Sequence, residues 1–143
     1  MFLDLENLDV LLKETDYRSL SGLSLAFIGD AVYELLIRKY ILSKGEARVK
    51  EMHKDCVRLV NADFQANTMD ILLPLLSEEE ISVFKRGRNA HSAHTPKNKS
   101  EAQYHKSTGF EALIGFLYLK KDYGRLNYLF SLIIEQGEKY EQH

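Results

Sequence analysis

The chain has 143 residues, of which 45% are hydrophobic and 28% charged, as is typical of one globular domain with its own hydrophobic core. Because Cys56 is the only cysteine, the sequence excludes an intramolecular disulfide and a multi-cysteine zinc site, and it favours a cytoplasmic protein. The acidic segment over residues 1–18 lacks the features of a signal peptide. No apolar run approaches the roughly 20 residues of a membrane helix, so we expect no membrane association.

Charge is distributed unevenly along the chain. The formal net charge of −2 on its own argues against nucleic-acid binding. Residues 85–106, however, contain six bases and one acid, a net charge of +5, so the remaining residues carry −7. This window is typical of an anion-binding surface loop, and a solvated basic loop without a ligand is the alternative.

The spacing of the apolar residues predicts an all-α protein. We expect a long, mostly buried helix over residues 22–44 that is closed by Gly45, and a second helix over about 49–60. A third helix over 64–73 should end at Pro74. The residues expected to form the apolar faces of the first two helices are Leu25, Ile28, Val32, Leu35 and Leu36, and then Val49, Met52, Cys56, Leu59 and Val60.

Two capping-box patterns predict where later helices begin. Residues 77–80 (SEEE) and 100–103 (SEAQ) each place a serine three residues before Glu or Gln. The first pattern predicts a short helix that ends near Arg86 and is followed by a loop over 87–99. The second predicts a helix that ends near Asp122.

A last helix is expected over about 125–136, which completes six to seven helices in one bundle-like domain. We expect this domain to span residues 19–143 and to follow the acidic segment over residues 1–18.

Two acidic residues lie in strongly apolar helical segments, each near a glycine. Asp30 follows Gly29, and Glu111 precedes Gly115 by four residues. Burial of an unpaired carboxylate is costly, and a glycine inside a helix indicates the close approach of a backbone or a ligand. If the two helices pack face to face, the carboxylates can converge on Mg²⁺, which takes one or two protein carboxylates together with waters and phosphate oxygens.

The alternative is that both acids are exposed or paired with Arg38 or Lys54, and that the glycines only permit tight helix packing. Glu34 shares a helix face with Asp30 and could join the site, although an exposed glutamate is favoured there. His91 and His94 lie in the basic window, where contact with phosphate or solvent is favoured over metal binding.

Four short motifs resemble the ribonuclease III family. Residues 25–32 (LAFIGDAV) are similar to the signature helix of its catalytic domain, and residues 110–115 (FEALIG) to its second catalytic helix. Residues 85–90 (KRGRNA) and 95–98 (TPKN) resemble segments of the Mini-ribonuclease III proteins. These proteins are a short bacterial branch of the family that lacks the double-stranded-RNA-binding domain. The resemblance covers about residues 20–136.

The resemblance implies a ribonuclease III-type endonuclease domain. It implies a magnesium-dependent endoribonuclease that cleaves double-stranded RNA and matures the 23S ribosomal RNA precursor, with a ribosomal protein as a possible helper. Asp30 and Glu111 would be the catalytic residues and metal ligands. The family also implies a homodimer with Phe27 at its interface. The residues that would contact the RNA are Lys85, Arg86, Arg88, Asn89, Lys97, Asn98 and Lys99.

The larger members of the family place four carboxylates around each site. Ala26 and Thr108 stand at two of these positions here, so only Asp30 and Glu111 match the pattern, and Thr108 could orient a water instead. A catalytically inactive ribonuclease III-fold subunit that binds RNA is therefore the alternative function.

Overall fold

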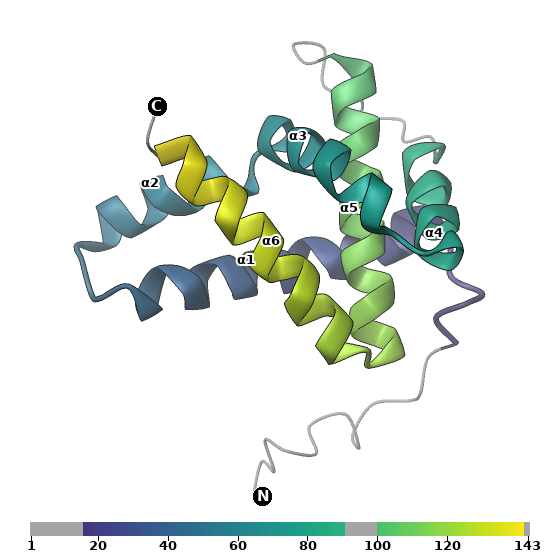
Figure 1. Cartoon of the computed structure of the whole chain (residues 1–143), viewed down its shortest axis with the longest axis horizontal. Helices are drawn as coiled ribbons and strands as arrows, with labels where there is room; N and C mark the ends of the chain where they lie inside the picture. Colours follow the sequence, from purple (N-terminus) through teal and green to yellow (C-terminus); the bar gives the residue numbers. More distant parts are fainter. Residues whose placement is uncertain (1–15, 91–99, 142–143) are drawn as a thin grey trace, which may run out of the picture.

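The computed structural model describes residues 16–90 and 100–141, which contain six α-helices, one short 3₁₀-helix and no strand (Figure 1). The α-helical fold class and the number of helices predicted from the sequence are confirmed. The helices are α1 (Gly22–Ser43), α2 (Val49–Val60), α3 (Ala62–Leu72), the 3₁₀-helix η2 (Leu73–Leu75), α4 (Glu78–Arg88), α5 (Glu101–Lys120) and α6 (Tyr123–Glu141).

Helix α5 lies at the centre of the fold, where it packs against α1, α3 and α4 (Figure 1). From Ser107 to Leu117 every residue is buried except Glu111, which is half-buried. A helix that is apolar on all sides is expected where neighbours surround it. Glu111 is therefore the only charged residue in a stretch whose other side chains are all buried.

Glycines allow α1 and α5 to cross with their backbones in contact. A Cβ atom on Gly29 would overlap the carbonyl oxygen of Glu111, and one on Gly115 would overlap the carbonyl oxygen of Leu25. The sequence-based expectation that these glycines mark the close approach of another backbone is confirmed. The crossing fixes Asp30 next to the turn of α5 that carries Glu111.

A second pair of glycines brings α4 against α5. A Cβ atom on Gly87 would lie 2.9 Å from the Cα of Gly109 and 2.6 Å from the Cβ of Ala112. The prediction that a loop begins at Gly87 is wrong, because α4 continues to Arg88. Gly87 serves helix packing and does not end the helix.

Two residues assigned to the core from their helical spacing are exposed: Leu35 is 60% exposed and Val49 is 63% exposed. The predicted apolar stripe on α1 is wider than the face covered by the rest of the chain, so Leu35 lies outside the core. Val49 is the first residue of α2 and lies at the end of the helix. Cys56 and Leu59, further along the same stripe, are buried as predicted.

The first capping box forms as predicted, and only half of the second one forms. The Ser77 amide donates to the Glu80 carboxylate at 2.8 Å, and the Glu80 amide donates to the Ser77 hydroxyl at 3.2 Å. At the start of α5, the Ser100 hydroxyl accepts from the Gln103 amide, but the Gln103 side chain donates to Asn67 of α3 instead. The contact with the neighbouring helix replaces the second bond of the box.

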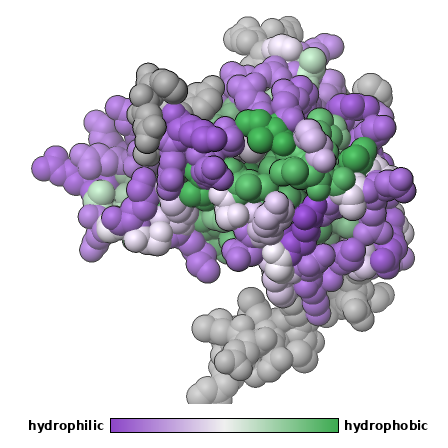
Figure 2. Space-filling model, in the orientation of Figure 1, coloured by the Kyte–Doolittle hydropathy of each residue, from purple (hydrophilic) through white to green (hydrophobic). Residues whose placement is uncertain are grey.

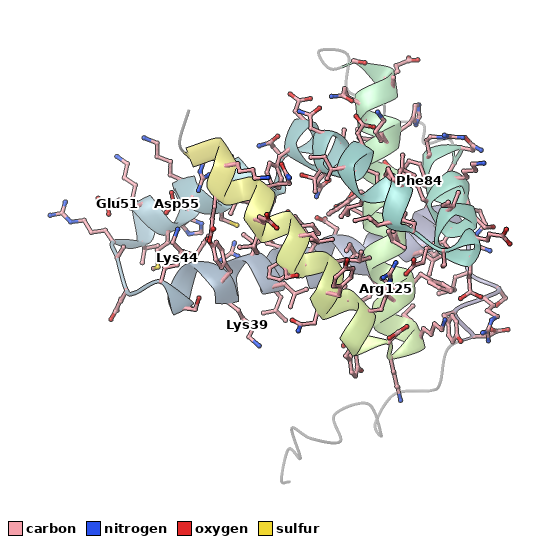
Figure 3. The ribbon with its side chains drawn as sticks, in the orientation of Figure 1. Lys39, Lys44, Glu51, Asp55, Phe84 and Arg125 are labelled. Atoms are coloured by element: carbon pink, nitrogen blue, oxygen red, sulfur yellow. The ribbon has the colours of Figure 1, made fainter. Side chains whose placement is uncertain are left out.

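Arg125 ties the start of α6 to α4 and η2. Its guanidinium donates to both carboxylate oxygens of Glu80 at 2.8 Å and to the carbonyl of Leu75 at 2.9 Å. Figure 3 labels Arg125 on α6 and Phe84 on the neighbouring helix α4. The face seen in Figure 2 is mainly polar, with apolar side chains gathered near its centre. Within the described residues, no helix is long and apolar enough to cross a membrane.

Candidate active site

Asp30 of α1 and Glu111 of α5 lie side by side where the two helices cross. Their carboxyl groups are near enough to influence each other, since the Asp30 carboxyl raises the pKa of Glu111. Since Gly29 and Gly115 remove any side chain from the crossing, the two backbones approach closely enough to bring these carboxyls together. The structure thus brings together the two acids that the sequence singled out.

The two carboxyl groups differ in burial. Glu111 is half-buried, whereas Asp30 is exposed, which contradicts the expectation that both acids lie in a buried environment. The reason is that apolar neighbours of Asp30 on α1 are themselves exposed: Phe27 is 84% exposed, and Ala31 is also open to solvent. The pair therefore opens to solvent on the side of Asp30.

The environment of Glu111 strongly favours its protonated form. Burial is the main cause, and the neighbouring Asp30 adds to it, so that the pKa of Glu111 rises from 4.5 to about 9. The Gln65 side chain opposes this shift through a hydrogen bond. A divalent cation between the carboxyl groups would supply the positive charge that the pair lacks, so both could ionise.

The chemistry of the pair fits Mg²⁺. Magnesium binds through oxygen ligands, and one or two protein carboxylates suffice where waters and phosphate oxygens complete the shell. Among the described residues there is no cluster of three or more histidine, cysteine or acidic side chains suited to a metal. The exposed side of Asp30 leaves room for water and a phosphate group. Asp30 and Glu111 are thus the residues that would hold the ion.

Thr108 and Ala26, at positions where larger relatives of the resembled family carry acids, are both buried. The Thr108 hydroxyl donates to the carbonyl of Tyr104 at 3.1 Å, within its own helix. Its proton is therefore used, and only its oxygen lone pairs remain to accept from a water.

Glu34 is engaged elsewhere. Its carboxylate lies 3.7 Å from the guanidinium of Arg38, and both side chains are about half exposed, at 47% and 51%. The exposed position favoured for Glu34 from the sequence agrees with this pair. Arg38, which the alternative interpretation paired with Asp30 or Glu111, lies next to Glu34 instead.

The last turn of α4 presents basic side chains close to this site. Lys85 and Arg86 are exposed, and the half-buried Arg88 lies over the Phe84 ring and donates to the exposed side chain of Asn89. A Cβ on Gly87 would lie 3.1 Å from the carbonyl oxygen of Thr108, one turn of α5 before Glu111.

Other residues of the basic window fall outside the described part of the chain. These are His91, His94, Lys97, Asn98 and Lys99. Their predicted roles therefore remain predictions.

An apolar hollow adjoins the exposed face of α1. It has a volume of about 710 Å³ and is formed by α1, α6 and the end of α5. Residues that line it include Ile28, Ala31, Leu35, Leu36, Tyr118 and Phe130. Phe27, predicted to lie at an interface, is the most exposed large hydrophobic residue of the described chain.

Sequence reasoning missed Gln65, which is 3% exposed on α3 and lowers the pKa of Glu111. A single glutamine in an amphipathic helix is indistinguishable from an ordinary surface residue. Asp63, Asn67 and Thr68 lie close to Gln65 in the sequence and are also polar, so the sequence does not show which of these side chains faces α5. Only the packing of α3 against α5 shows that Gln65 does.

Comparison with known proteins gives a consistent result. Residues 23–122 match the model of the Ribonuclease III domain. Mini-ribonuclease 3 of Thermoanaerobacter sp. is 45% identical over 94% of this chain and 94% of its own length. Mini-ribonuclease 3 of Clostridium tetani is 43% identical over 90% of this chain and 85% of its own length. A crystal structure of a Fusobacterium nucleatum protein superposes with a TM-score of 0.77 at 34% identity, covering 85% of this chain and 98% of that protein.

Proposed function

Since the chain belongs to the ribonuclease III family, and within it to the Mini-ribonuclease 3 proteins, it is an endoribonuclease, and we propose that it cleaves double-stranded RNA in a Mg²⁺-dependent reaction. We propose the 23S ribosomal RNA precursor as its substrate and the cytoplasm as its location. In this proposal residues 19–143 form the catalytic domain and act as a homodimer.

The crossing of α1 and α5 at Gly29 and Gly115, which sets Asp30 beside Glu111, carries the proposal. Asp30 and Glu111 would hold Mg²⁺, and the ion would supply an activated water for in-line attack on the phosphodiester and stabilise the leaving oxygen. Glu111 approaches from the buried side and Asp30 from the solvent side. The half-buried carboxylate thus fixes the position of the site, and the exposed one leaves it accessible to a duplex.

The basic turn of α4 supports a role in binding RNA. Lys85 and Arg86 are exposed, and the Arg86 guanidinium also donates to the carbonyl of Arg18. Gly87 beside them lies against Thr108, three residues before Glu111, and Arg88 and Asn89 follow. Double-stranded RNA is recognised mainly through its shape and its phosphate backbone, which these side chains can contact. Lys97, Asn98 and Lys99 continue the basic window and are proposed to act with them.

The exposure of Phe27 supports a homodimer. Phe27 does not stand alone: Leu35 on the same helix is also exposed, and both adjoin an apolar hollow of about 710 Å³ that is large enough for an aromatic ring. A contiguous apolar patch of this kind is typical of an interface. In a two-fold dimer the same surface of each copy meets its counterpart, so each copy would contribute both a ring and a hollow. The dimer would provide one site for each RNA strand.

Cleavage of a long RNA duplex tests the proposal. The native protein with Mg²⁺ should cut the duplex, and Asp30→Asn and Glu111→Gln should each lose at least about 100-fold in rate, since loss of partners that only support a metal ligand already costs 10–100-fold. Glu34→Gln is the matched control, because it neutralises a carboxylate on the same helix that pairs with Arg38. Its rate should remain near that of the native protein.

Two outcomes would contradict the proposal. A native protein that binds the duplex without cutting it would indicate an RNA-binding subunit. Equal cleavage in EDTA would exclude the metal requirement.

Cleavage of the 23S precursor with and without bound ribosomal proteins would then show whether a protein helper is needed.

A further inference from the structure

One face of α1 contacts α5 at two successive turns. At the first, Gly29 lies against the carbonyl of Glu111. At the second, the ring of Tyr33 packs edge-on against the ring of Phe110, with the ring centroids 5.0 Å apart and an interplanar angle of 89°. Gly29 and Tyr33 are four residues apart and so lie on the same face of α1. The two backbones therefore touch at the glycine, and two rings lie between the helices one turn further along α1.

The side chain of Tyr33 is held at both ends. It is completely buried, and its hydroxyl donates to the carbonyl of Leu59 at 2.7 Å. This carbonyl belongs to the last turn of α2, where carbonyls have no partner within their own helix. The ring is thus attached to α1 through its backbone and to α2 through its hydroxyl. It cannot move aside without breaking a buried hydrogen bond, which is costly.

The two contacts flank both proposed metal ligands. Asp30 lies between Gly29 and Tyr33 in α1. Glu111 directly follows Phe110 in α5. The side chains at a crossing of two helices determine its angle and distance. We propose that Tyr33 is a positioning residue, whose ring sets the angle between α1 and α5 and thereby the separation of the Asp30 and Glu111 carboxyls. This inference rests on the proposed function, since it concerns the same site.

Two substitutions at Tyr33 separate the ring from the hydroxyl. Tyr33→Phe keeps the ring contact and loses only the bond to the Leu59 carbonyl, so the protein should be less stable but bind Mg²⁺ with native affinity. Tyr33→Leu keeps a large apolar side chain with a high helix propensity but removes the ring. Its Mg²⁺ affinity, measured by calorimetry without RNA, should fall about 10–100-fold, as is found for residues that support metal ligands.

Ile133→Ala is the matched control for lost stability. Ile133 is completely buried on α6, and the substitution removes core atoms without removing any atom of α1 or α5. The variant should be less stable and keep the native Mg²⁺ affinity. All affinities are measured at a temperature at which circular dichroism shows each protein to be folded. Native affinity in a folded Tyr33→Leu protein would overturn the proposal, and so would an equal loss in Ile133→Ala.

Phe110→Leu removes the other ring of the same contact and provides a second variant if Tyr33→Leu does not fold. Its Mg²⁺ affinity should fall by the same factor. Because Tyr33 and Phe110 act through one contact, the double variant with both leucines should lose little more affinity than either single variant. A folded Phe110→Leu protein with native affinity, or a Tyr33→Phe protein that loses as much affinity as Tyr33→Leu, would overturn the role of the ring.

A measurement on the native protein does not depend on the folding of a variant. If the Tyr33 contact favours Mg²⁺ binding, Mg²⁺ must strengthen that contact by the same factor. Exchange of the Tyr33 hydroxyl proton with solvent, followed by NMR, should therefore slow on addition of Mg²⁺ by more than exchange of the Ile133 amide proton does. Equal slowing of both would overturn the inference. If the native protein cleaves duplex RNA with Mg²⁺ while these tests fail, only this inference fails; if it does not cleave, the proposed function fails.

Discussion

Gly29 of α1 lies directly against the carbonyl of Glu111 in α5, at a distance that leaves no space for a Cβ atom. Asp30 follows Gly29 in the chain, so this contact sets the separation of Asp30 and Glu111, the two proposed metal ligands. A substitution at Gly29 therefore changes both the packing of the two longest helices and the separation of the two carboxyls.

Gly29→Ala is expected to destabilise the protein by about 2–4 kcal/mol, since overpacking against a backbone cannot be relieved by a rotamer change. Cleavage should fall further than stability alone explains. Gly124→Ala, at an exposed glycine of α6 with no atoms near its Cβ position, should instead be neutral or stabilise by up to about 1 kcal/mol. Chemical denaturation with both variants checks this. A Gly29→Ala protein as stable as the native one would contradict the described crossing.

The metal-free protein should lose stability as the pH rises. The pKa of Glu111 is about 9 in the folded state and near 4.5 when the chain is unfolded, so between these values the folded state holds the extra proton. Stability from this group is complete below pH 4.5 and is lost as the pH approaches 9. Glu111→Gln, which cannot ionise, should therefore melt at a higher temperature than the native protein at pH 8 in EDTA.

The expected difference at pH 8 is about 3–5 kcal/mol, or about 8–20 °C in melting temperature. Mg²⁺ should raise the melting temperature of the native protein more at pH 8 than at pH 6, because binding displaces the proton. The Glu34→Gln protein should keep the native pH dependence. A native melting temperature that is flat between pH 5 and 8.5 in EDTA would contradict the raised pKa.

The sequence predicted most of the fold because local signals determine it. The capping serine at Ser77 and the end of α1 just before Gly45, which has a positive φ, are set within a few residues, and both the cap and the helix end lie where predicted. Gly87 shows the limit of such signals: a glycine after a basic run is typical of a helix end, but here it faces Gly109 of another helix. Whether such a glycine ends its helix or packs against another helix depends on contacts between segments that are far apart in the sequence.

In the candidate site, too, local sequence signals predicted some features, and contacts between distant segments determine the others. Asp30 and Glu111 could be identified because an acid is unusual in an apolar helix, and the nearby glycines predicted a close crossing. The exposure of Asp30 could not be deduced, since an apolar helix face that is left uncovered has the same pattern as one in the core. Gln65 was missed because its role depends on how α3 packs against α5.

Phe27→Asp should convert a dimer into a monomer. Burial of one phenylalanine side chain contributes about 2 kcal/mol, so the loss of two rings per dimer should weaken association by about 10³-fold. Light scattering with size-exclusion chromatography measures the mass. Leu42→Asp is the control, because Leu42 is a 57% exposed apolar residue near the end of the same helix and does not line the hollow. A Phe27→Asp protein that remains dimeric would place the interface elsewhere.

Neutralising the basic turn of α4 should weaken RNA binding in a salt-dependent way. For the double variant Lys85→Gln and Arg86→Gln, the slope of log K against log salt should become shallower by about 1–2, as expected for two lost phosphate contacts. The variant Lys39→Gln with Lys50→Gln removes the same charge from exposed positions on α1 and α2 and should keep the native slope. Equal slopes for all three proteins would exclude the turn from the RNA interface.

The pair of Glu80 and Arg125 should stabilise the fold more than any surface ion pair near it. Burial alone would raise the pKa of Glu80, but hydrogen bonds from Arg125 and from the Ser77 backbone outweigh it, so the pKa lies below its usual value of 4.5. Stability from this carboxylate is therefore present above pH 4.5 and is lost as the pH falls below it.

Arg125→Met should cost about 2–4 kcal/mol, because it leaves a carboxylate that is 6% exposed without its partner. Lys120→Met breaks the neighbouring pair with Glu79, whose side chain is 47% exposed, and should cost less than about 1 kcal/mol. Urea denaturation at pH 7 compares the two. A Glu80→Gln protein should lose less stability than the native protein as the pH falls below 4.5. If Arg125→Met is no less stable than Lys120→Met, the bidentate pair does not hold α6 against α4.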